Sequence, residues 1–240
     1  MYDSNVSTPL GGYTVPRLTN KRQSVLEAPE GDLFDLEIVR AHLRFPNPKE
    51  NDYLKDIILP TAIGAVEDYI GRALLTRKVK MTMDCVPGLG GEDSYRSGNG
   101  YFPVTFSNVG AFRWFELLGS PVSEVEAFTY FEEDGTEKTF DDTNYLVDLE
   151  DKDRLARIVL QRGALWPTAL QVAKALSITY YIGYGDKDAV PPQLKHAVLL
   201  ITTALFTNRG DSADSQDLVL HFPQVKALLA PFIMMNFTTI

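Results

Sequence analysis

Carboxylates crowd the segment from Glu132 to Asp153, which holds ten acidic residues against two lysines. Two carboxyl groups at close range can perform general acid–base catalysis or bind a hard cation. Because like charges repel, a group of this size is best tolerated where water screens the repulsion. A solvated face is therefore the simpler interpretation, and the residues that define it are Glu132, Glu133, Asp134, Asp141 and Asp142.

The other residues with chemical potential are scattered along the chain. His42, His196 and His221 lack the paired spacing of a metal site. The single cysteine, Cys85, alternates in phase with apolar residues of a predicted strand and is interpreted as a small core side chain. The glycines after Pro87 fit neither GxGxxG nor GxxxxGK[ST]. The sequence thus predicts no catalytic residue, no cofactor and no metal.

Basic residues form one loose cluster, at Arg72, Arg77, Lys78 and Lys80. Exposed aromatic residues, which nucleic-acid surfaces often add, are not interleaved with them. The formal net charge of −9 also opposes a surface built to neutralise phosphates. Ion pairs with neighbouring acids are the simpler interpretation of these cations.

Composition indicates a soluble globular protein. Of the 240 residues, 45% are hydrophobic and 23% charged, which allows a sizeable core. The longest apolar stretch, near residues 197–206, is far shorter than the ~20 residues that cross a bilayer. The first residues lack the basic and apolar regions of a signal peptide. We expect a protein made in the cytoplasm.

Helices are predicted near both ends of the chain. Asp35 is expected to cap a helix that runs to Arg44, with its carboxylate accepting backbone N–H groups. Apolar residues at helical spacing continue from about residue 50 to Gly71, where the helix should stop, and Pro60 should kink it. Pro191 and the following proline open a last long helix, because proline suits a helix start.

Strands are predicted between these helices. Apolar and polar residues alternate over 78–85, and strand signals recur at about 113–118, 124–131, 137–140, 144–148, 156–160 and 175–182. The run from Glu133 to Thr136 marks a hairpin between two of these strands. We therefore predict an α+β fold in which helices from both ends of the chain pack around an antiparallel β-sheet.

Two arms and one loop stand apart from this core. Residues 1–32 show no periodicity, and they are expected either to dock on a neighbouring chain or to fold back on their own domain. The glycine-rich stretch at 87–110 is expected to be a mobile loop that a partner orders. Residues 218–240 contain one charge, Lys226. Of these, Val225–Leu229 are expected to pack on their own domain, while 231–240 suit insertion into a partner.

An ordered set of short motifs resembles the head–tail connector, or adaptor, family of tailed bacteriophages. The first two are the run from Asp35 to Arg44 and the helix end Glu67-Asp68-Tyr69-Ile70-Gly71-Arg72-Ala73-Leu74. The motifs that follow, in order, are Leu118-Gly119-Ser120-Pro121-Val122, Arg157–Leu160, Trp166-Pro167, Tyr180–Gly185, Val190–Lys195 and Leu228–Phe232.

The resemblance implies a division of the chain. Residues 1–32 form an extended N-terminal arm, and 33–230 form the connector domain, helical over 35–72 and 192–230 and rich in strands over 76–185. Residues 231–240 form a C-terminal docking tail. The arm and the insertion around 88–110 exceed what such adaptors commonly carry.

The resemblance also implies a function. Such a protein is a structural, non-enzymatic virion component at the head–tail interface, assembled in the host cytoplasm. About twelve copies form a ring beneath the portal protein, bind the next tail or stopper component, and continue the DNA channel without sequence-specific DNA binding and without a membrane anchor. On this view the acidic face lines the channel, where it repels phosphate. Two alternatives stay open: a small carboxylate-dependent hydrolase and a DNA-binding packaging accessory.

Two sets of contact residues follow from the resemblance and the local composition. The apolar tail should bind the portal through Phe232, Ile233, Met234, Met235 and Phe237. The long loop should contact a neighbouring copy or the tail through Tyr95, Tyr101, Phe102 and Phe106.

Overall fold

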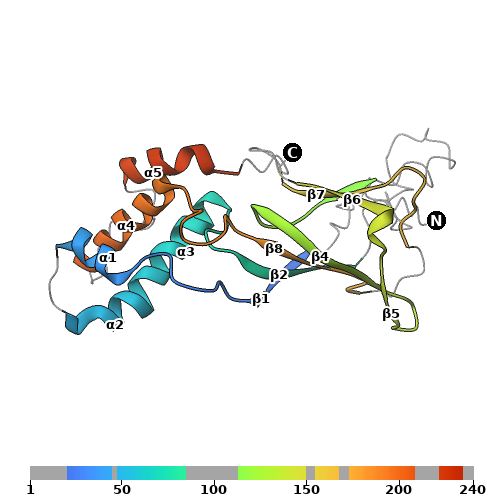
Figure 1. Cartoon of the computed structure of the whole chain (residues 1–240), viewed down its shortest axis with the longest axis horizontal. Helices are drawn as coiled ribbons and strands as arrows, with labels where there is room; N and C mark the ends of the chain where they lie inside the picture. The colour runs from blue at the N-terminus through green and yellow to red at the C-terminus, as the bar shows by residue number, and fades with distance from the viewer. Residues whose placement is uncertain are drawn as a thin grey trace, which may run out of the picture.

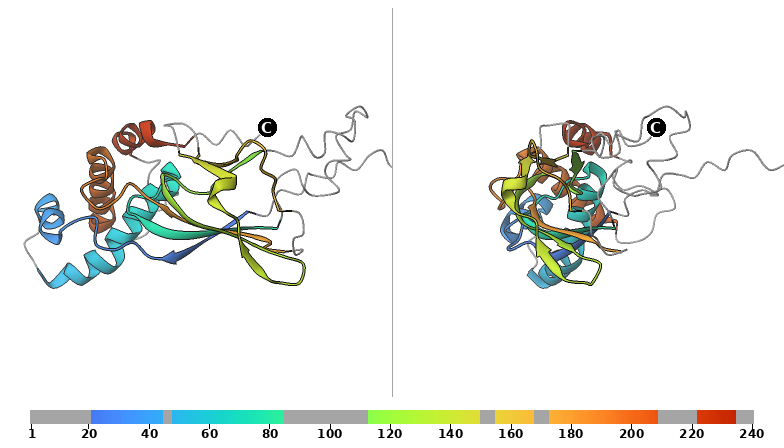
Figure 2. Two further views of the ribbon diagram at one scale, coloured as in Figure 1. Left: turned by 45° about the vertical axis from the view of Figure 1, so that its right-hand side comes forward. Right: turned by 90° about the vertical axis from the view of Figure 1, so that its right-hand side faces the viewer.

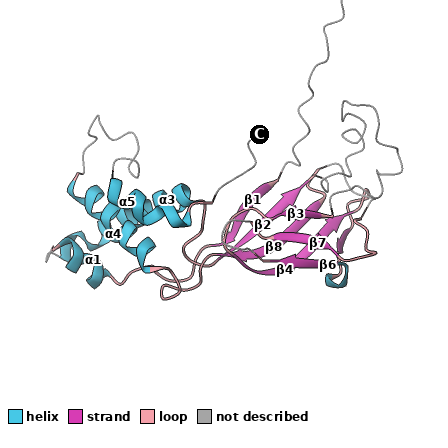
Figure 3. Cartoon of the chain, turned by 90° about the horizontal axis from the view of Figure 1, so that it is seen from above, coloured by secondary structure: helices cyan, strands magenta, loops and turns pink. Residues whose placement is uncertain are grey.

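The computed structural model describes residues 21–44, 48–84, 113–149, 155–167, 173–208 and 222–234. Helices gather at one end of the molecule and strands at the other (Figure 1). This confirms the predicted α+β class, with one difference in arrangement. The helices pack on each other beside the end of the sheets and do not wrap around them (Figure 3).

The helical region combines residues from both ends of the described chain. Its elements are α1 (Leu36–Leu43), η1 (Pro48–Glu50), α2 (Asn51–Tyr53), the π-helical η2 (Leu54–Ile58), α3 (Leu59–Ile70), α4 (Pro192–Thr207), α5 (Pro223–Leu229) and η6 (Ala230–Phe232).

Asp35 occupies the predicted cap position of α1 but does not cap the helix with its side chain. The Asp35 carboxylate instead accepts hydrogen bonds from the Lys187 ammonium at 2.9 and 3.0 Å. The first backbone donor of the helix, the N–H of Ile38, bonds the Asp35 carbonyl oxygen at 3.0 Å. The predicted side-chain cap is therefore wrong, because a lysine distant in sequence takes the carboxylate.

The predicted long helix forms and ends at Gly71, whose φ of 70° is left-handed. Leu59, Ala62, Val66 and Ile70 form its buried face. Pro60, near the start of α3, is preceded by the π-helical turn η2. A π-helical turn is wider than an α-helical one, because its backbone hydrogen bonds join residues five positions apart.

Helix α4 begins at the predicted proline pair and buries Leu194, Ala197, Val198 and Ile201. Helix α5 buries Val225 and Leu229 against it. The expectation that Val225–Leu229 packs on its own domain is confirmed.

The β region contains two antiparallel sheets that face each other. The strands are β1 (Arg22–Glu27), β2 (Arg77–Met83), β3 (Trp114–Glu116), β4 (Val122–Phe131), β5 (Glu137–Thr139), β6 (Tyr145–Asp148), β7 (Arg157–Leu160) and β8 (Leu176–Ile182). The larger sheet has the order β1-β2-β8-β4-β5, and the smaller has the order β3-β7-β6.

Alternation explains how the sheets pack. In β2 the apolar residues Val79, Met81 and Met83 are fully buried, whereas the residues between them reach the outer face. Facing them from the smaller sheet are Phe115 and Ile158. The predicted hairpin is confirmed, since β4 and β5 pair antiparallel across the turn.

Part of the N-terminal arm belongs to the larger sheet. Residues Arg22–Glu27 form its edge strand β1, paired antiparallel with β2. For this segment, folding back on its own domain is the alternative that the structure supports. Residues 1–20 lie outside the described part of the chain.

The two regions have separate apolar cores, and the chain passes between them from β1 to α1, from α3 to β2 and from β8 to α4. Backbone bonds tie the end of β8 to the start of β2, with the N–H of Tyr184 donating to Leu74 and that of Thr76 to Gly185. The Tyr180 hydroxyl donates to the Leu118 carbonyl at 2.5 Å, and burial raises the pKa of this phenol.

Candidate functional site

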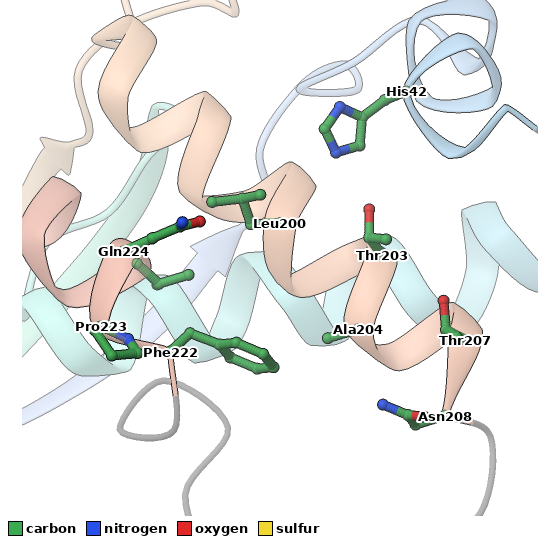
Figure 4. A pocket seen from close by; sticks show the side chains of 10 residues that line it. His42, Leu200, Thr203, Ala204, Thr207, Asn208, Phe222, Pro223 and Gln224 are labelled. Atoms are coloured by element: carbon green, nitrogen blue, oxygen red, sulfur yellow. The ribbon is translucent and has the colours of Figure 1, made fainter.

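An apolar groove of about 650 Å³ lies in the helical region, between α1, the second half of α4 and the start of α5 (Figure 4). Its lining residues are His42, Leu200, Thr203, Ala204, Thr207, Asn208, Phe222, Pro223, Gln224 and Val225. None of these carries a carboxyl group or a permanent positive charge. The groove is suited to apolar side chains and offers no paired carboxylates for hydrolysis.

The polar groups of the groove have local roles. The Thr203 hydroxyl donates to the Leu199 carbonyl one helical turn earlier, at 3.0 Å. The His42 ring meets the ring of His196 edge-on, with centroids 6.4 Å apart. Sequence spacing does not reveal this pair, because α1 and α4 bring the two histidines together from positions far apart in the chain.

Glu132, Glu133 and Asp134 lie in the turn of the β4–β5 hairpin, which projects at the tip of the β region (Figure 2), while Asp141 and Asp142 come directly before β6. Glu133, Asp134, Asp141 and Asp142 are exposed, and Glu132 is half-buried. Glu132 pairs with Lys138 at 2.7 Å. This location matches a solvated face and not a closed catalytic pocket.

Two of these carboxylates stabilise turns. Asp134 accepts the N–H of Thr136 at 2.9 Å, and this backbone bond lowers the pKa of Asp134. Asp141 accepts both the hydroxyl and the N–H of Thr143, at 2.6 and 2.8 Å, and these bonds lower the pKa of Asp141. Both groups therefore stay ionised at neutral pH and hold local backbone.

The basic cluster is engaged in contacts within the chain. Arg77 pairs with Glu67 of α3, and Lys78 pairs with Glu126 of β4 at 2.6 Å. Arg72 is buried and donates through Nε to the Phe232 carbonyl at 2.9 Å. The predicted ion pairing is confirmed for Arg77 and Lys78.

The start of the predicted docking tail lies on the helical region. The N–H of Met234 donates to the Ile70 carbonyl at 3.0 Å, and the Met234 side chain is only 9% exposed. Phe232 packs against the helical core, while Ile233 is 37% exposed. The structure thus fixes the base of the tail next to the end of α3.

Several predicted contact residues lie outside the described part of the chain. They are Tyr95, Tyr101, Phe102 and Phe106 of the long loop and Met235 and Phe237 of the tail; Cys85 and His221 lie outside it as well.

Sequence reasoning missed an apolar row on the outer face of the smaller sheet. Leu146, Val159 and Trp114 are cross-strand partners on β6, β7 and β3. Their neighbours along β7, Ile158 and Leu160, point into the core. The row is visible in the sequence only once β6, β7 and β3 are known to be adjacent.

Within the described ranges, no three metal-ligating side chains gather in one place. In the same ranges, no helix combines the length and apolar character that crossing a membrane requires.

No protein-family model matches the chain, and no curated protein matches it. Solved structures do. A chain from the neck of an empty gene transfer agent (GTA) particle, computed with C6 symmetry, superposes with a TM-score of 0.68 at 20% identity. The match covers 91% of this chain and 98% of that one.

Two further structures agree. A chain of the native GTA virion matches with a TM-score of 0.65 at 20% identity, over 90% of this chain and 97% of that one. A chain from the native GTA neck, computed with C12 symmetry, matches with a TM-score of 0.64 at 19% identity, over 91% and 98%.

The chain has the fold of these particle-neck proteins. The resemblance to head–tail connectors is thereby confirmed at the level of the fold. Because the match spans nearly all of both chains, the neck-protein fold includes the helical region and the β region together.

Proposed function

We propose that this protein is a head–tail connector, a structural subunit of a virion or virus-like particle. The observation that carries the proposal is the match of nearly the whole chain to chains of particle necks. Copies form a ring beneath the portal, join the head to the tail or stopper component, and continue the DNA channel. One matching neck was computed with C12 symmetry, which supports a ring of twelve.

The proposal includes no enzymatic activity. The groove lacks carboxylates; four of the five acidic candidates are exposed, and Glu132, Asp134 and Asp141 are engaged in an ion pair or in turn-forming hydrogen bonds. A carboxylate-dependent hydrolase would need two such groups to converge where water is limited. No observation in the described ranges favours that alternative.

Passage of DNA without adhesion fits the charge of the β-region tip. We assign Glu132, Glu133 and Asp134, in the turn between β4 and β5, to the channel side of the ring, where fixed negative charge repels phosphate. The basic residues Arg77 and Lys78 are already paired with carboxylates, which argues against a DNA-binding accessory.

The C-terminal tail is proposed to dock on the portal. Its base, through Met234, is held on the subunit by the Arg72–Phe232 and Ile70–Met234 bonds. Ile233 is exposed there, and Met235 and Phe237 follow it. Phe232 and Met234 contact the subunit itself, so docking relies on Ile233 and the residues after Met234.

The aromatic residues of the 87–110 insertion are proposed to contact the tail-side component or a neighbouring copy. Tyr95, Tyr101, Phe102 and Phe106 supply large contact areas, as aromatic anchors do at interfaces.

The test of the proposed function is reconstitution with portal-bearing heads that lack this subunit. Purified protein should add a ring of density beneath the portal in electron cryomicroscopy and should allow tails to attach. Heads that stay bare and tailless after incubation with folded protein would refute the proposal. Salt-sensitive binding of the free protein to duplex DNA would instead support the packaging accessory.

The tail assignment has its own test. Deleting residues 235–240 keeps Phe232 and Met234 in place, so the thermal melt should not change, yet the protein should fail to join portal-bearing heads. Replacing the same six residues with Gly and Ser is the length-matched control and should fail equally. Normal attachment of either variant would show that residues 235–240 do not bind the portal.

A further inference from the structure

We infer that neighbouring copies meet through two opposite margins of the β region, one built on β1 and the other on β6. This inference rests on the proposed ring and identifies the surfaces that would close it. The β1 margin comprises Arg22, Val25, Leu26 and Lys80. The β6 margin comprises Asp141, Asp142, Leu146, Leu149 and Val159.

The β1 margin exposes an apolar row that is buried elsewhere in the sheet. Val25 pairs with Val79, Val79 with Tyr180, and Tyr180 with Val125, so these side chains share one face. Val79 and Tyr180 are fully buried, whereas Val25 is 57% exposed. The apolar row therefore extends to Val25, beyond the residues that the smaller sheet buries. A partner that packs on Val25 would bury the rest of the row.

The edge of β1 is short and defined. Regular pairing with β2 runs from Arg22 to Val25, and the register shifts before Glu27. A bulge of this kind limits how far another strand can extend the sheet. The exposed Leu26 lies at this shift, next to Val25.

The β6 margin is apolar as well. Leu146 is 58% exposed, and Leu149 just after the strand is also exposed. Val159 continues the row on β7. Among the described strands, β6 is an edge strand of the smaller sheet, as β1 is of the larger one. The four residues of β6 equal in number the regularly paired residues of β1.

Charge complementarity identifies the occupant as another copy of this chain. Arg22 is exposed, and Lys80 of β2, which pairs with Ser24, lies two residue pairs along the ladder from Arg22 and on the same face. On the other margin, Asp141 and Asp142 are exposed directly before β6. A basic rim beside Val25 and an acidic rim beside Leu146 match when the β1 margin of one copy meets the β6 margin of the next.

The positions of the margins fit a closed ring. β1 and β6 lie on opposite sides of the β region in two different views (Figures 1 and 3). A contact between two different surfaces repeats from copy to copy, and it closes into a ring when the rotation between neighbours divides a full turn, as the twelve-fold ring of the proposed function requires. A β1-to-β1 contact would stop at a two-fold dimer.

Cross-linking on portal-bearing heads tests the inference. In a Cys85→Ala background, Val25→Cys combined with Leu146→Cys should yield a ladder of covalent multimers with a short bismaleimide. Each single-cysteine variant should remain monomeric on the denaturing gel. Val25→Cys combined with Ile57→Cys is the matched control, because Ile57 is 52% exposed but lies in the helical region; it should give no ladder.

Each outcome is decisive. Dimers formed by Val25→Cys alone would show a two-fold contact and overturn the inference, as would a ladder from the Ile57 control alone. Ring density with no cross-link between positions 25 and 146 would overturn it while leaving the proposed function intact. If the unmodified chain adds no density beneath the portal, the proposed function itself fails.

A second measurement does not depend on the cysteine-free background. Val25→Asp should leave the melt unchanged, because the side chain is exposed, and should reduce ring occupancy on heads at least tenfold. Ile57→Asp should assemble normally. Equal assembly by both variants would overturn the inference.

Discussion

Arg72 shows how one side chain links two parts of the chain that are far apart in sequence. It lies two residues after the end of α3, is buried, and donates to the Phe232 carbonyl 160 positions away. A buried guanidinium is costly unless its donors are satisfied, so its partners are part of the fold. The position of the base of the C-terminal tail therefore depends on Arg72. From the sequence alone, this residue is interpreted only as one member of a basic cluster.

Replacing Arg72 with Met should destabilise the subunit. The Phe232 carbonyl loses its charged donor while the apolar volume is kept, and a loss of about 1–3 kcal/mol is expected. Urea unfolding measures the effect. The exposed Arg162→Met serves as the control and should change stability by less than about 0.5 kcal/mol. Equal effects of the two substitutions would mean that the Arg72 contact contributes nothing.

Asp141 should titrate below its ordinary range because of Thr143. The Thr143 hydroxyl is the main cause of the lowered pKa, so Thr143→Val should raise the pKa of Asp141 toward 3.8. Because the folded-state pKa is depressed, the stabilising effect exists above the unfolded pKa and disappears as pH falls through the folded pKa.

Carboxyl-carbon NMR measures this titration. The resonance of Asp134, whose pKa is lowered by Thr136, is the internal control and should titrate unchanged in the same variant. An Asp141 pKa that does not move would show that the Thr143 hydroxyl has no role.

At the scale of elements, the junction between the two regions depends on close backbone approach. Gly183 ends β8 with φ +128°, and a Cβ atom there would overlap the Leu75 carbonyl. Gly183→Ala should therefore cost about 2 kcal/mol or more, through both clash and backbone strain. Calorimetry should show a clearly lowered melting temperature.

At Gly64 in α3, in contrast to Gly183, replacement by alanine should stabilise the protein. Gly64 has ordinary helical geometry and open space around its Cα, so Gly64→Ala should stabilise the protein by about 0.5–1 kcal/mol. A loss of stability in this variant would show that the helix needs the glycine for contacts outside the described residues.

Much of the element order is predictable because hydrophobic periodicity and the glycine or proline residues at helix ends are local signals in the sequence. The alternation in β2, the stop at Gly71 and the proline start of α4 all appear in the structure. What sequence reasoning missed is mostly non-local. Lys187 takes the Asp35 carboxylate from the cap, and β1 forms because β2 offers an edge to an otherwise unpatterned segment.

The candidate sites follow the same rule. The solvated acidic face is predictable, since mutual repulsion is a property of the segment itself. The groove at His42 and the apolar row through Leu146 arise only when distant elements become neighbours. No spacing along the chain encodes them.

At the scale of the whole molecule, an elongated subunit with two cores carries a strong negative charge (Figure 1). The margins of the β region are complementary to each other, but every copy brings a net charge of −9. Repulsion between copies then opposes a ring that has no template, and under the proposed function the attraction to the portal would offset this repulsion.

We therefore predict that the isolated subunit is a monomer, or a weak mixture of oligomers, at micromolar concentration. Raising the salt from 0.1 to 1 M shortens the screening length from about 10 to about 3 Å, so self-association should increase. Replacing Glu132, Glu133 and Asp134 with amides removes three negative charges that lie outside the β6 margin and should have the same effect at low salt. Sedimentation velocity measures self-association in both experiments.

A stable closed ring of the unmodified protein at low salt, without portal, would contradict the prediction. Association that falls as salt rises would show that the Arg22 and Asp141–Asp142 rims, and not net repulsion, dominate between free copies.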